Sequence, residues 1–166
     1  FYYAPSSSVV ILPAESRDIP FIFNEVSNDF QEITIQGQAT YRVRDPEKLA
    51  ALLDFSVDVF SNYTGDGAEK LGVRVTNSVQ LAIREKFKEM SLRDALAGAS
   101  VLVQHAAGKL KSSELLSALG IEILDLSILK IAPTPDMSRA LEASAREKLY
   151  KEADDAIYER RNSAVE

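Results

Sequence analysis

The C-terminal part of the sequence constrains the fold more than any other stretch. After Thr134-Pro135-Asp136, no glycine or proline interrupts the chain up to Glu166. Threonine can cap a helix, proline suits the first helical position, and an acidic residue is favourable against the helix dipole. The pattern predicts one continuous helix of about 30 residues, roughly 45 Å long at 1.5 Å per residue. We therefore expect two parts, a domain over residues 1–133 and a helix over residues 134–166.

A narrow apolar stripe runs along this predicted helix. Its members are four residues apart: Leu141, Ala145, Leu149, Ala153 and Ile157. Steps of four exceed the average heptad step, which favours a straight or slightly right-handed pairing. Because a thin stripe cannot hold so polar a helix by itself, another surface must cover it. We expect a copy of the same helix in a coiled-coil-like assembly; packing back on its own domain is the alternative.

The first part of the chain contains strand patterns. Residues 8–12 and 19–23 are short runs that favour strands, and Pro20 indicates an edge position for the second. Residues 33–44 alternate strictly between apolar or small and polar side chains, so one face packs and the other meets water. Residues 121–131 carry Ile and Leu on both faces, which predicts a central strand.

Helical patterns lie between these strands. Asp45-Pro46-Glu47 begins a short helix. Residues 71–90 carry an amphipathic helical stripe, and residues 100–119 form another helix with a possible break at 112–113. Gly120 is a natural stop. The predicted class is α+β: a mixed or antiparallel sheet packed by helices, followed by the long C-terminal helix.

Composition excludes several classes of function. The net charge is -6 and the sequence has no cysteine. Nucleic-acid binding is not expected, because it needs clustered Lys and Arg, and neither disulfides nor thiolate metal sites can form. No apolar run approaches the roughly 20 residues that cross a bilayer. The chain opens at Phe1 without an initiator Met, so we expect an internal piece that lacks the first segment of its domain.

Three stretches, taken in order, carry a family resemblance. Residues 33–43 end in Tyr-Arg-Val, residues 120–128 begin with Gly-Ile-Glu, and residues 140–147 open an Ala- and Glu-rich helix. Their order and spacing resemble the SPFH (Band 7) domain of stomatin, prohibitin and flotillin, over most of the chain.

The resemblance implies a function. Proteins with this domain build large oligomers on membranes that organise lipids or partner proteins. It implies a non-enzymatic, self-associating scaffold module that forms a homo-oligomer, is cytoplasmic and membrane-associated, and has membrane proteins as possible partners. On this interpretation Arg42 and Arg44, on the polar side of their strand, contact a neighbouring subunit or lipid phosphates; simple solvent exposure is the alternative.

No chemistry of an active site is marked in the sequence. His105 is the single histidine, and with no second histidine and no cysteine we expect a helix-surface or partly packed imidazole. We expect no catalytic, cofactor-binding or metal-binding residues and no cofactor. Two alternatives stay open: a small-molecule-binding or enzymatic α+β domain with residues 61–67 as a lid, and an adaptor that binds a different protein through the long helix.

Overall fold

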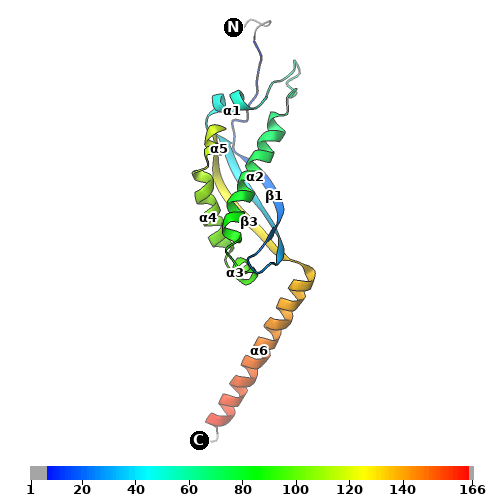
Figure 1. The fold of residues 1–166 in the computed structure, drawn as a ribbon, viewed down its shortest axis with the longest axis vertical. Helices are drawn as coiled ribbons and strands as arrows, with labels where there is room; N and C mark the ends of the chain where they lie inside the picture. The colour runs from blue at the N-terminus through cyan, green and yellow to red at the C-terminus, as the bar shows by residue number, and fades with distance from the viewer. Residues whose placement is uncertain (1–6, 165–166) are drawn as a thin grey trace. The chain divides into compact units, whose positions relative to one another are not determined.

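The computed structural model describes residues 7–164, which form an α+β fold as predicted. Figure 1 shows a sheet with helices, followed along the chain by one long helix. By contacts, the chain divides between Ile131 and Ala132 into two compact units, which are described separately below.

The sheet of the first unit has three antiparallel strands, β1 (Arg17–Val26), β2 (Glu32–Val43) and β3 (Ile121–Pro133), in the order β1-β2-β3. The prediction that residues 121–131 form a central strand was wrong, because β2 is central and β3 is an edge. Leu124 and Leu129, which suggested burial on both faces, are 47% and 67% exposed. Residues 8–12 form no strand either; Val10 makes an isolated bridge to Ser56.

The strict alternation predicted for β2 is present in the structure. Its register against β1 pairs Phe21 with Gly37 and Phe23 with Ile35. The inward face of β2 is buried at Ile33, Ile35, Gly37, Ala39 and Tyr41. Pro20 lies in β1, which is an edge strand as its missing amide donor requires.

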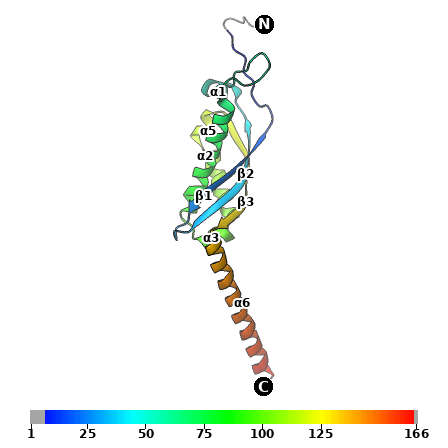
Figure 2. The ribbon, with the colours of Figure 1, turned by 90° about the vertical axis from the view of Figure 1, so that its right-hand side faces the viewer.

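Helices cover the buried face of this sheet, as the two views in Figures 1 and 2 show. They are α1 (Pro46–Leu52), α2 (Gly67–Phe87), α3 (Leu92–Ala97), α4 (Ala99–Lys111) and α5 (Glu114–Ala118). Residues 100–119 are thus two helices, and the break lies where the sequence placed it.

Side-chain caps explain where several of these helices begin. Asp45 accepts a hydrogen bond from the amide of Lys48 at the start of α1, and Ser113 accepts one from the amide of Leu116 at the start of α5. Each cap satisfies an amide that lacks a partner inside its helix. Ser113 therefore starts a new helix directly after the break.

The helix α2 joins the sheet to the other helices. It packs against β1 and α4. Its predicted stripe is buried at every position within the helix: Leu71, Val75, Val79, Ala82, Ile83 and Phe87. Met90, the last member predicted, lies beyond the helix end and is half-buried.

A charged pair crosses from the sheet to α2. The Glu25 side chain on β1 is buried, and its carboxylate accepts hydrogen bonds from Nε of Arg84 at 2.9 and 3.0 Å. The amide nitrogen of Gln80 donates a further bond at 3.1 Å. A buried carboxylate needs such partners, because an unpaired charge away from water is strongly unfavourable.

Gly120 connects α5 to the start of β3. Its φ is +68°, a left-handed conformation in which glycine carries no Cβ penalty. Its carbonyl accepts the amides of Arg44 at 2.8 Å and Asp45 at 3.1 Å, and a Cβ here would overlap the carbonyl oxygen of Asp45. The predicted helix stop is therefore also the contact that joins the end of β2 to the start of β3.

The second unit is dominated by one helix, α6 (Pro135–Ser163), of 29 residues. Thr134 caps it by accepting a hydrogen bond from the amide of Met137, and Pro135 takes the first helical position, both as predicted. No residue of α6 is buried.

Gly37 supplies a test of the packing inside the sheet. A Cβ at this position would overlap the ring of Phe21 and the carbonyl oxygen of Ser127 on β3. We expect Gly37→Ala to lower the free energy of unfolding by about 1–3 kcal/mol, as overpacking of a core does, measured by urea denaturation.

Gly108 provides the matched control, because a Cβ there meets nothing within 4 Å and the residue lies inside α4. Gly108→Ala should raise the stability by about 0.5–1 kcal/mol through helix propensity. Equal effects of the two substitutions would contradict this view of the sheet.

Candidate assembly surfaces

The stripe predicted on α6 is open to solvent along most of its length. Leu149 is 65% and Ile157 49% exposed, Ala145 and Ala153 are exposed, and Leu141 is half-buried. A step of four residues advances about 40° around a helix, so the stripe turns through roughly 160° from Leu141 to Ile157. The five residues therefore wind around α6 and do not share one straight face.

Two tyrosines add to the exposed apolar surface of α6. Tyr150 is 72% and Tyr158 67% exposed. Each directly follows a stripe residue, Leu149 or Ile157, and so widens the surface that a partner could bury. The sequence prediction missed both because they do not fall on the four-residue spacing.

The structure separates the two arginines that the sequence placed together. Arg42 lies in β2, and its Nε donates to a carboxylate oxygen of Glu122 on β3 at 2.7 Å. Arg44 lies just beyond the end of β2, and its side chain lines a cleft. Arg42 thus joins two strands of its own sheet, while the guanidinium of Arg44 has no ion pair within residues 7–164.

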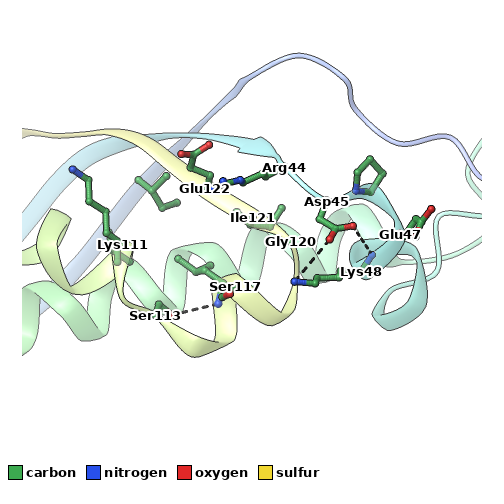
Figure 3. A pocket seen from close by; sticks show the side chains of 14 residues that line it. Arg44, Asp45, Glu47, Lys48, Lys111, Ser113, Ser117, Gly120, Ile121 and Glu122 are labelled. Atoms are coloured by element: carbon green, nitrogen blue, oxygen red, sulfur yellow. Dashed lines mark hydrogen bonds and ion pairs between the residues drawn. The ribbon is translucent and has the colours of Figure 1, made fainter.

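That cleft has a volume of about 950 Å³ and lies between the start of α1, the end of α4, α5 and the start of β3. Figure 3 shows its polar rim. Three cationic and three anionic side chains line it: Arg44, Lys48, Lys111, Asp45, Glu47 and Glu122. Because these charges balance, the cleft has no preference for an anionic ligand. The predicted lid, residues 61–67, does not line it.

Residues 57–63 instead form a tight loop with an apolar tip. The Asp58 carboxylate accepts the backbone amides of Phe60 at 2.8 Å and Asn62 at 2.9 Å, and these bonds hold the pKa of Asp58 below its usual value. Val59 and Phe60 at the tip are 92% and 81% exposed. The hydrogen bonds of the Asp58 carboxylate hold the loop in a shape that leaves the side chains of Val59 and Phe60 in solvent.

A second exposed aromatic side chain lies at the turn between β1 and β2. Phe30 is 88% exposed and has a φ of 58°. The turn is fixed to the end of α2 and the start of α3, because Met90 accepts the amide of Asn28 at 3.0 Å and Asp29 accepts the amide of Leu92 at 3.1 Å. No sequence pattern marks Phe30, since it belongs to neither a strand nor a helix pattern.

An apolar groove of about 220 Å³ lies between α2 and the α4–α5 corner. Leu81 and Leu115 on its walls are 57% and 48% exposed. Glu85 and Lys109 form an ion pair at 2.9 Å on its rim. The groove is thus a small apolar depression with a polar edge.

His105 lies on α4 as a half-buried side chain, and its Nε2 atom has no hydrogen-bond partner in the described structure. Within residues 7–164, no three His, Cys, Asp or Glu side chains gather in a way that could hold a metal ion. No helix in the same range combines the length and the apolar character that crossing a membrane requires.

Comparison with known proteins identifies one family. A model described as the SPFH domain / Band 7 family matches residues 1–164. No curated protein matches the sequence.

The turn that presents Phe30 should depend on pH through Asp29. A hydrogen bond from the Ser27 hydroxyl, and secondarily the amide of Leu92, holds the pKa of Asp29 below its usual value. A carboxyl group with a lowered folded-state pKa stabilises the fold above its unfolded pKa and loses that contribution as the pH falls through the folded value. Asp29→Asn should therefore have a lower melting temperature than the unmodified chain near neutral pH. This difference in melting temperature should shrink below about pH 4, where Asp29 itself becomes protonated.

Melting curves of both proteins between neutral and strongly acid pH measure this difference. Asp155→Asn is the control, because Asp155 is an exposed residue of α6 with no ion pair among the described residues. A deficit for Asp29→Asn that stays constant into the acid range would show that the charge of Asp29 does not hold the turn.

Proposed function

Because this chain belongs to the SPFH domain / Band 7 family, we propose that it is a non-enzymatic scaffold module that associates with copies of itself. In this role it forms oligomers that organise membrane proteins or other partners at the cytoplasmic face of a membrane. The family supports a scaffold in general terms. Self-association is the finer part of the proposal, and it rests on α6.

The observation that carries the proposal is the exposure of α6. Over its 29 residues no side chain is buried, yet Leu149, Tyr150, Ile157 and Tyr158 expose about half or more of their surface. An isolated helix of such polar composition has little to hold it, since most helical stability in proteins comes from packing an apolar face. A second copy of α6 supplies a face of matching length and composition.

The winding of the stripe also bears on the geometry of the pairing. A stripe with four-residue steps stays in contact with a partner only where the helices coil around each other in a right-handed sense. The alanines at positions 145 and 153 leave room for close approach at two points between the larger side chains. Pairing of this kind involves α6 alone and leaves the surfaces of the first unit open to further contacts.

Charged substitutions in the stripe test self-association. Replacing both Leu149 and Ile157 with Asp places two carboxylates in the proposed helix contact, where burial of an unpaired charge is unfavourable. We expect this double variant to stay monomeric by light scattering at concentrations where the unmodified chain forms the proposed oligomer, while its circular-dichroism spectrum stays that of an α+β fold.

The matched control carries the same change in charge away from the stripe. Ala140 is nine residues from Leu149, on the opposite side of the helix, and Ser163 is about 120° from Ile157 and about 140° from Tyr158. Ala140→Asp with Ser163→Asp should leave the oligomer intact. Equal dissociation by both double variants would indicate a general effect of charge and contradict the stripe as the contact.

A further inference from the structure

The cleft beside α1 and α5 borders the edge of β3. Four consecutive residues, 120–123, belong to its lining. Side chains alternate between the two faces of a strand, so a cleft on one face would be lined by every second residue. A consecutive run instead indicates that the edge of the strand, with its backbone groups, lines the cleft. The end of α4 and α5 form the facing wall, as Figure 3 shows.

The outer edge of β3 is open to a further strand. β3 pairs with β2 along one edge, and within residues 7–164 no other strand pairs with its second edge. An unpaired edge presents a row of free N–H and C=O groups, which is a template for another strand. The opposite edge of the sheet, on β1, carries Pro20, which discourages further pairing. β3 contains no proline before its last residue, Pro133.

The free edge of β3 selects the class of ligand that the cleft can bind. Its backbone donors and acceptors are spaced as in a strand, and another extended chain presents matching groups at the same spacing. A lipid tail has no hydrogen-bonding group, and a small molecule would pair with only a few of these groups. The volume of the cleft, about 950 Å³, lies at the large end of the range for binding sites. These features favour an extended peptide.

Charged side chains at the two ends of the cleft give the peptide a direction. Lys111 and Glu47 lie at opposite ends in Figure 3, with Arg44 between them. All three are exposed, and none makes an ion pair within residues 7–164, whereas the other charged residues of the lining are paired. Complementary charges fix the register of a contact. A peptide with an acidic residue at one end and a basic residue at the other therefore matches the cleft.

The other extended segments of this chain do not match the cleft. Residues 8–12 favour a strand but carry no charge, and β1 contains Pro20. We propose that the cleft binds an extended peptide segment of a different protein, which adds to β3 as a fourth strand and places an acidic side chain at Lys111 and a basic one at Glu47. This site adds a partner contact to the proposed scaffold function and does not depend on self-association.

Two synthetic peptides test the site, because an added strand can run in either direction. They are acetyl-Glu-Val-Thr-Val-Thr-Lys-amide and acetyl-Lys-Val-Thr-Val-Thr-Glu-amide, each with a fluorescent label and titrated with the full chain. Fluorescence anisotropy should show that one of them binds and that the other binds at least about tenfold more weakly, since its charges meet like charges.

Methylation of the peptide backbone tests strand addition itself. In an added strand, every second amide faces β3 and the others face solvent. Methylating the first set in the preferred peptide should weaken binding at least about tenfold, because the hydrogen bonds to β3 are lost. Methylating the second set is the matched control and should leave binding nearly unchanged. Equal effects of the two sets would show that the peptide does not pair with β3.

Exchanging the charges of the cleft tests the direction of the peptide. Lys111→Glu combined with Glu47→Lys should reverse the preference between the two peptides. Lys88→Glu combined with Glu69→Lys is the matched control, because these exposed residues occupy the end and the first turn of α2 and do not line the cleft. The control should keep the original preference. A reversal in both double variants, or in neither, would contradict the role of these charges.

Hydrogen exchange distinguishes the possible occupants of the edge and separates this site from the proposed function. The preferred peptide should slow amide exchange in β3 and leave β1 unchanged. If exchange in β3 slows without peptide as the protein concentration rises, a second copy covers the edge and the peptide site is wrong. If neither peptide binds, the site is also wrong, while an oligomer in sedimentation still supports self-association. A monomeric chain that binds one peptide supports the site and contradicts self-association.

Discussion

The buried carboxylate of Glu25 and its partners on α2 provide the interaction on which the domain depends most directly. Glu25 accepts hydrogen bonds from Arg84 and Gln80, so the end of β1 is tied to the last turns of α2. The turn after β1 can then reach Met90 and Leu92. Because a buried carboxylate is tolerated only with such partners, the same interaction holds the sheet on α2 and keeps the turn that carries Phe30 close to the end of α2.

Local patterns in the sequence were sufficient for the parts of the fold that depend on near neighbours. The alternation in residues 33–44 gave the buried face of β2, and the stripe from Leu71 to Phe87 gave the buried face of α2. Caps at Asp45 and Thr134 gave the starts of α1 and α6. The order of the strands could not be derived in this way. Ile and Leu on both faces of β3 suggest a central strand, but they do not show whether another strand pairs with its second edge, and in the structure β3 is an edge strand.

The candidate surfaces were only partly predictable for a related reason. The exposed positions of Leu149 and Ile157 follow from helical spacing on α6, although their assembly is still a prediction. Arg42 pairs with Glu122, which lies 80 residues away along the chain, and no local pattern gives such a pairing. Phe30 depends on a turn held by residues of two distant helices, so its exposure and its left-handed conformation are visible only in three dimensions.

The central claim of this account is that the chain associates with itself. Sedimentation equilibrium of the unmodified chain at increasing protein concentration tests that claim most directly. The account predicts a mean mass that rises from one chain of 18.3 kDa to that of a closed or growing oligomer as the concentration reaches tens of micromolar. A mass that stays at one chain throughout this range would contradict it.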